Sequence, residues 1–168
     1  MGSGKSTIGP LLAQRLGWTF YDLDERIEAA AGCTIREIFD TAGEAAFRRL
    51  EREHLRALLG SATANPHMVI ALGGGAFVQP ETFDYLRHAP VCTLFLDVPF
   101  EELHRRCSQM DNRPLFRDPD AFAALYQKRL PFYRQAHAVI PAGHGTPDEI
   151  VDQIVAHLAL PQLRSVAE

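Results

Sequence analysis

The first seven residues, MGSGKST, carry the residue types that bind phosphate groups. Gly4, Lys5 and Ser6 match the end of the phosphate-loop pattern G-x-x-x-x-G-K-[ST]. Glycines let backbone N–H groups surround phosphate oxygens, and a helix that begins at Lys5 directs its positive dipole end at them. We expect Lys5 to reach the β- and γ-phosphates and the Ser6 hydroxyl to bind Mg²⁺. A flexible tail is the competing interpretation, but a helix with leucine spacing follows in register.

Two carboxylates follow the expected strand over residues 18–21. Asp22 and Asp24 are two positions apart, so both can point to one cleft at the end of that strand. One carboxylate can hold Mg²⁺ through water, and the other can accept a proton from a substrate hydroxyl. The alternative is that Asp22 only caps the helix that follows.

Three glycines follow an apolar run over residues 68–72. Because each glycine costs conformational entropy, Gly73, Gly74 and Gly75 favour close approach of the backbone to a ligand. A purely structural turn remains the alternative.

Three arginines have a geometry that suits a carboxylate or a transferring phosphoryl group. They are Arg48 in F-R-R-L-E, Arg113 in N-R-P-L and Arg129 just before L-P-F-Y. For each of them taken alone, a solvated arginine on a helix face is the default interpretation.

Apolar spacing predicts the elements that position these residues. Helices are expected over 5–16, 24–31, from 34 onward, 43–59, 80–87, 99–109, 120–130 and from 146, and strands over 18–21, 68–72, 91–96 and 138–140. Strands that alternate with helices predict an α/β fold with a parallel sheet covered on both faces. Ligands gather at the carboxyl ends of such strands, which is where the candidate residues occur. The polar, proline-rich residues 111–119 are expected to form a loop or lid.

Composition limits the class of protein. A chain of 168 residues suits one domain, 1–168, and its 46% hydrophobic and 23% charged shares are ordinary for a globular protein. The net charge of −4 argues against a nucleic-acid partner, and no apolar run approaches the roughly 18 residues that span a membrane. Three separated cysteines and no visible signal peptide favour a cytoplasmic location.

The ordered set G-S-G-K-S-T, D-L-D, F-R-R-L-E, L-G-G-G-A, N-R-P-L and R-x-P-x-Y resembles shikimate kinases, from Met1 to about residue 158. The resemblance implies transfer of the γ-phosphoryl group of ATP to the 3-hydroxyl of shikimate, with Mg²⁺, in aromatic amino-acid biosynthesis. It also implies a three-layer P-loop sandwich, related to nucleoside monophosphate kinases, with a five-stranded parallel sheet. We expect a monomer whose partners are ATP and shikimate.

The resemblance assigns roles to matching positions. The positions that bind ATP phosphates in the family match Gly2, Ser3, Gly4, Lys5, Ser6 and Thr7. The positions that hold Mg²⁺ match Ser6 and Asp22. The positions that bind shikimate match Asp24, which is the expected base, and Arg48, Gly73, Gly74, Gly75 and Arg129. Arg113 matches the lid arginine, within a lid at about 111–124, and Arg106 and Pro147 match the residues that flank adenine. Lys5, Asp24 and Arg113 are the expected catalytic residues.

Two departures from the family pattern affect these expectations. The strand and first glycine of the phosphate loop would lie before Met1, so we expect Met1 to be an internal methionine of a longer chain. We therefore expect the 168-residue form to fold poorly or to bind ATP weakly. Residues 143–146 lack an arginine that some relatives place near adenine.

Two other functions fit parts of the pattern. One is a regulatory module that binds a ligand without catalysis, and the other is a kinase of a different small polyol such as gluconate. Retention of Lys5, Asp24 and the three arginines together favours an enzyme. Two arginines beside D-x-D argue against gluconate.

Overall fold

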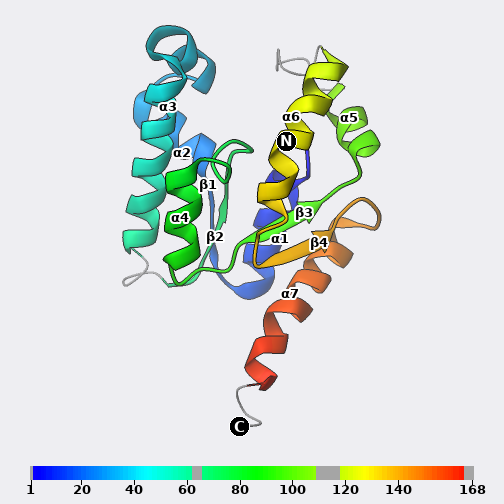
Figure 1. Cartoon of the computed structure of the whole chain (residues 1–168). Coiled ribbons are helices and arrows are strands. Elements are labelled where there is room, and N and C mark those ends of the chain that lie inside the picture. Colours follow the sequence, from blue (N-terminus) through cyan, green and yellow to red (C-terminus); the bar gives the residue numbers. More distant parts are fainter. Residues whose placement is uncertain (1, 62–65, 109–117, 165–168) are drawn as a thin grey trace.

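The computed structural model describes residues 2–61, 66–108 and 118–164. Helices and short strands alternate along these residues (Figure 1). Their order is α1 (Lys5–Leu16), β1 (Thr19–Asp22), α2 (Leu23–Ala31), α3 (Ile35–Gly60), β2 (Met68–Ala71), α4 (Pro80–His88), β3 (Leu94–Asp97), α5 (Phe100–Ser108), α6 (Pro119–Tyr133), β4 (Ala138–Pro141) and α7 (Pro147–Arg164). The expected order is confirmed, although β3 begins three residues later than predicted and α6 ends three residues later.

Local sequence signals set the helix ends. Gly17 ends α1 in the left-handed conformation, with φ of 69°, and its N–H donates to the carbonyls of Ala13 and Gln14. Thr34 and Glu37 form a reciprocal capping box at the start of α3. Gly43 interrupts α3 with φ of 79°, so the two helices expected from residues 34 and 43 join at a kink.

The strands form two separate parallel pairs. In one pair Thr19 of β1 lies opposite Met68 of β2, and in the other Leu94 of β3 lies opposite Ala138 of β4. Within the described ranges no hydrogen-bonded ladder joins β2 to β3, so the strands of the expected parallel sheet form two separate pairs here. Residues of β2 and β3 instead line a cavity of about 400 Å³. We call this space the inter-strand cavity.

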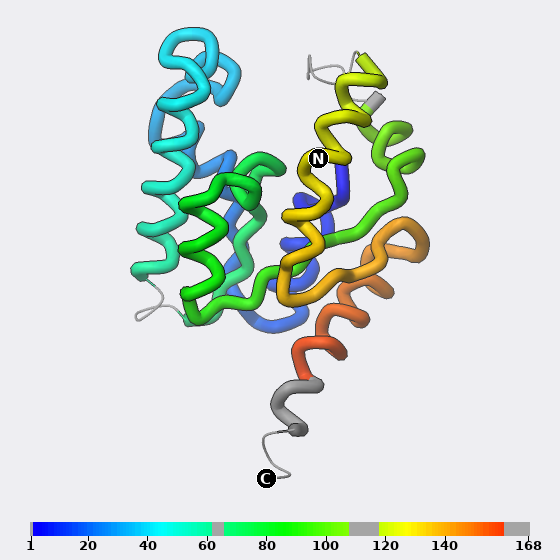
Figure 2. Tube along the Cα trace, viewed as in Figure 1, coloured from blue at the N-terminus to red at the C-terminus, as the bar shows by residue number. Residues whose placement is uncertain are grey.

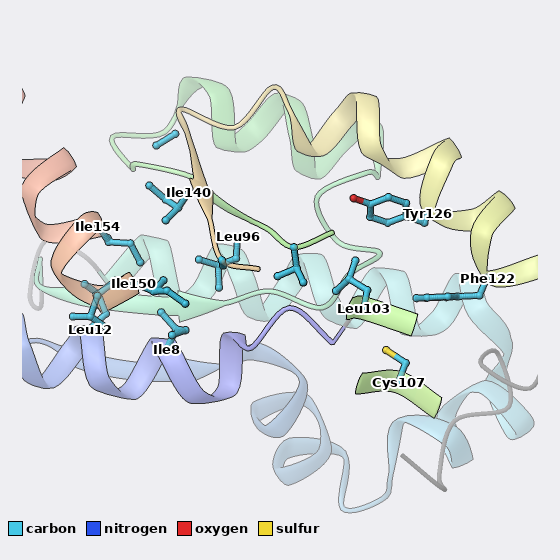
Figure 3. Close-up of a cluster of buried hydrophobic side chains, with 14 residues drawn as sticks. Ile8, Leu12, Leu96, Leu103, Cys107, Phe122, Tyr126, Ile140, Ile150 and Ile154 are labelled. Atoms are coloured by element: carbon cyan, nitrogen blue, oxygen red, sulfur yellow. The ribbon is translucent and has the colours of Figure 1, made fainter. Parts of the chain in front are cut away.

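Each strand pair, with the helices around it, has its own hydrophobic core, and we call these two groups of elements the halves of the molecule. One core gathers side chains of α1, β3, β4, α5, α6 and α7, and Figure 3 shows α1 and α6 on opposite sides of the β3–β4 pair. The other gathers side chains of α2, α3 and α4 against β1 and β2. Figure 2 shows α1 between the two groups of helices. Because α1 contacts α7 as well as β1 and β2, it joins the two halves.

Candidate active site

The phosphate-loop residues surround the start of α1. Gly2 and Gly4 both have positive φ, of 61° and 90°, and Gly4 is the N-cap of the helix. A Cβ atom at Gly2 would lie 2.6 Å from Sγ of Cys107, so only glycine fits against α5 there. The N–H groups of the first turn have no partner within a helix and attract anions. Lys5 is half-buried at this turn, with Ser3 beside it, while Ser6 and Thr7 are exposed.

The two expected Mg²⁺ ligands face each other. Oγ of Ser6 donates to Oδ2 of Asp22 at 3.4 Å. Asp22 also accepts the backbone N–H of Asp24 at 3.0 Å, so it caps α2 as the structural alternative expected. A hydroxyl and a carboxylate at a phosphate loop fit Mg²⁺, which binds few protein oxygens and takes the rest from phosphates and water. Within the described part of the chain no cluster of three His, Cys, Asp or Glu side chains could hold a metal by itself.

A second group of expected residues converges on the glycine segment after β2. A Cβ atom at Gly73 would lie 2.8 Å from Oδ1 of Asp24 and 3.1 Å from Oε1 of Glu51. A Cβ atom at Gly75 would lie 2.7 Å from Cζ of Arg48. Because side chains occupy the space where a Cβ would be, these glycines let charged groups close on the backbone.

Glu51 holds Arg48 in place and was not among the expected site residues. Nη1 of Arg48 donates to Oε2 of Glu51 at 2.8 Å, and Nη2 donates to Oε1 of Glu44 at 3.1 Å. The Glu51 side chain is only 1% exposed, and burial raises the pKa of this carboxyl against the opposing hydrogen bond from Arg48. The sequence could have indicated that Glu51 is buried through its spacing. Phe47, Glu51 and Leu55 are four residues apart and therefore lie on one face of α3.

Arg129 reaches the same group from α6. Burial raises the pKa of both Glu51 and Tyr133, and the positive charge of Arg129 opposes that rise in each, together with a hydrogen bond to Tyr133. We call Asp24, Arg48, Glu51, Arg129 and Gly73–Gly75 the substrate cluster. The structure therefore brings together expected residues from α2, α3, α6 and the segment after β2.

The residues expected around adenine are only partly brought together. Nη1 of Arg106 lies 4.0 Å from the position of a Cβ atom at Gly4, so this side chain lies beside the phosphate loop. Hydrogen bonds from Arg105 and Arg106 lower the pKa of Glu102 to about 2. Pro147 is exposed at the first turn of α7. Arg113 lies outside the described residues, as do residues 111–117 of the expected lid.

A parallel α/β fold with a phosphate loop at a helix start, next to paired carboxylates and arginines, defines a P-loop phosphotransferase. The family model for shikimate kinase matches residues 1–159. A shikimate kinase of Psychrobacter arcticus is 38% identical over 162 residues, which is 94% of this chain and 84% of the relative. This chain therefore belongs to the shikimate kinase family.

Solved structures agree with this assignment. The crystal structure of shikimate kinase from Aquifex aeolicus matches with a TM-score of 0.81 and 35% identity, covering 97% of this chain and 94% of that chain. Shikimate kinase from Acinetobacter baumannii, solved in complex with shikimate, matches with a TM-score of 0.83 and 32% identity, covering 97% and 90%. The predicted P-loop fold class is confirmed. The helices in the described part of the chain include none that is long and apolar enough to cross a membrane.

Proposed function

We propose that the protein transfers the γ-phosphoryl group of ATP to the 3-hydroxyl of shikimate and releases ADP and shikimate 3-phosphate, on the way to chorismate. The main support is the substrate cluster, in which two arginines and Asp24 converge on the Gly73–Gly75 segment. Ser3 and Lys5 line the same cavity as Gly73 and Gly74, so phosphate and acceptor sites adjoin. A small polyol with one carboxylate matches this arrangement of charges.

Phosphoryl transfer depends on positioning and charge stabilisation. We assign Lys5 and the lid residue Arg113 to the oxygens of the transferred group, and Gly2–Thr7 to the phosphates. Ser6 and Asp22 would hold Mg²⁺, which offsets phosphate charge when bound. Arg106 and Pro147 are assigned to the two faces of adenine.

The acceptor is oriented by the substrate cluster. Arg48 and Arg129 bind the carboxylate, and Gly74 is the glycine nearest to the substrate. Asp24 accepts the proton of the 3-hydroxyl as the oxygen attacks the γ-phosphorus. The lid at about 111–124 excludes water, whose attack would hydrolyse ATP.

The test is an ADP-coupled assay with ATP and Mg²⁺, run with shikimate, with gluconate and without an acceptor. We expect ADP formation only with shikimate, together with shikimate 3-phosphate in equal amount. ADP formation with gluconate would indicate a kinase of another polyol. Shikimate binding without turnover would indicate a ligand-binding module.

Asp24→Asn is expected to remove almost all turnover while ATP binding and the melting temperature stay close to wild type. The amide keeps the shape of the side chain but cannot accept the hydroxyl proton as a carboxylate does. The measurements are kcat for shikimate and calorimetric titration of ATP. A kcat near the wild-type value would limit Asp24 to orienting the substrate.

We also propose that the enzyme acts as a monomer in the cytoplasm. The substrate cluster and the phosphate loop come from one chain, so a second copy is not needed to complete them. Cys33, Cys92 and Cys107 are thiols and not disulfides, which suits a reducing compartment. Light scattering coupled to size-exclusion chromatography tests the monomer.

A further inference from the structure

Tyr133, the last residue of α6, connects both halves of the molecule at the substrate cluster. Its hydroxyl donates a hydrogen bond to the carbonyl of Gly74, which follows β2. Its ring stacks on Phe95 of β3, with ring centres 5.2 Å apart and planes at 30°. Because β2 and β3 are separated by the inter-strand cavity, which Tyr133 also lines, this side chain bridges the two strand pairs.

The same hydroxyl faces Arg129. The two residues are four positions apart on α6, so their side chains lie on one face of the helix. Burial raises the pKa of Tyr133, while a hydrogen bond and the charge from Arg129 oppose that rise. A hydroxyl that accepts from a guanidinium keeps its own proton for a second acceptor. Here that acceptor is the carbonyl of Gly74.

We propose that Tyr133 is a positioning residue that holds Arg129 and the Gly73–Gly75 segment in the arrangement that binds the acceptor's carboxylate. This inference rests on the proposed function. The hydroxyl fixes the direction of the Arg129 guanidinium through one hydrogen bond and the backbone of Gly74 through the other. Tyr133 itself does not touch the reacting atoms.

Packing alone does not explain a tyrosine at this position. The stacking on Phe95 would be the same for a phenylalanine, which has the same ring without the polar group. A half-buried hydroxyl is costly unless it is hydrogen-bonded, and here its two partners both belong to the substrate cluster. The oxygen atom of Tyr133 is therefore the part that bears on substrate binding.

The experiment compares Tyr133→Phe with Tyr126→Phe. Tyr126 is a buried tyrosine of the same helix, labelled in Figure 3, and it lies in the hydrophobic core. We expect Tyr133→Phe to raise the KM and the dissociation constant for shikimate about fivefold to tenfold, as for loss of a hydrogen bond that orients a charged group. The KM for ATP and the melting temperature should stay close to wild type. Tyr126→Phe should leave the shikimate KM unchanged.

A double-mutant cycle with Arg129→Ala separates positioning from packing. If Tyr133 acts in part through Arg129, Tyr133→Phe should weaken shikimate binding by a smaller factor once Arg129 is already alanine, and the remaining effect reports the hydrogen bond to Gly74. Equal losses in both backgrounds would overturn the inference. So would a lower melting temperature with an unchanged shikimate KM.

The outcomes also separate this inference from the proposed function. A wild-type protein that phosphorylates shikimate, with Tyr133→Phe indistinguishable from it, rejects only the role of Tyr133. A wild-type protein that binds shikimate without turnover rejects the kinase, and the dissociation constants of the variants still decide the role of Tyr133. A wild-type protein that does not bind shikimate rejects both.

Discussion

Glu51 is a buried carboxyl group whose second oxygen, Oε1, accepts no hydrogen bond from any described residue. Its other oxygen binds Arg48, so the pair is held inside the protein next to Gly73. Burying an ion pair costs desolvation energy that the attraction between the charges only partly offsets. The pair therefore serves to aim the Arg48 guanidinium more than to stabilise the fold.

Glu51→Gln is expected to change how stability depends on pH. Burial raises the pKa of Glu51 above its ordinary value of 4.5 in the folded state. Between pH 4.5 and that raised pKa, the folded protein therefore binds more protons than the unfolded chain does. Wild-type stability should therefore fall, relative to the variant, as pH rises from 4.5 through the raised pKa. Urea unfolding of both proteins between about pH 5 and pH 8 measures this difference. A constant difference across that range would contradict a raised pKa.

Arg129→Ala is expected to raise the KM for shikimate far more than the KM for ATP. Loss of one charge-assisted contact to a carboxylate should cost roughly 1.5–3 kcal/mol. Steady-state kinetics with each substrate varied in turn measures the effect. Arg134→Ala, at the exposed C-cap of the same helix, is the matched control and should leave both KM values unchanged. A raised KM for ATP with normal shikimate kinetics would refute the assignment.

At the scale of elements, the sequence predicted most helix ends because the signals are local. The glycine at position 17 and the capping box at Thr34 act within one turn, so they are readable without a structure. Candidate residues after β1 and β2 were also located correctly, since parallel strands present their carboxyl ends at one edge. The grouping of Asp24, Arg48 and the glycines follows from that topology.

Two element ends were misjudged, one because of a contact distant in sequence and the other because a helix continued past a proline. Thr93 was expected inside a strand, but its N–H donates to Nδ1 of His137, so β3 begins only at Leu94. Pro131 was expected to follow the end of α6, yet the N–H of Arg134 still bonds the carbonyl of Leu130 and the last turn continues. That extra turn is what brings Tyr133 to the substrate cluster. Apolar spacing carries no information on either contact.

Gly43 and Gly60, both in α3, should respond oppositely to alanine. Gly43 has φ of 79°, where a Cβ is strained, so Gly43→Ala should destabilise the protein by about 1 kcal/mol or more. Gly60 has no positive φ, and a Cβ there would have no atom within 4 Å, so Gly60→Ala should stabilise by about 0.4–1 kcal/mol. Urea unfolding of both variants measures the two changes. A stabilising Gly43→Ala would show that the kink is not required.

At the scale of the whole molecule, α1 and Tyr133 connect two strand pairs that share no ladder. A parallel strand between β2 and β3 would pair both facing edges and fill the inter-strand cavity. In the described part of the chain, the arrangement of the two halves therefore depends mainly on helix packing around α1.

The inter-strand cavity also has a consequence for volume. Space that is inefficiently filled in the folded state disappears on unfolding, and pressure then favours the unfolded chain, whose molar volume is typically smaller by about 20–100 mL/mol. The inter-strand cavity of about 400 Å³ has a mostly apolar lining, so we expect its loss on unfolding to contribute to such a volume decrease in this protein. Trp18, the chain's only tryptophan, lines the cavity, so its fluorescence under pressure reports the transition.

Val69→Phe, which adds bulk to the wall of the cavity, should raise the midpoint pressure of unfolding. The same substitution at the exposed Val139 of β4 should leave that midpoint unchanged. Equal midpoints for wild type and Val69→Phe would mean that the cavity is already closed in solution. The midpoint pressure of unfolding thus reports how tightly the two halves of the molecule pack against each other.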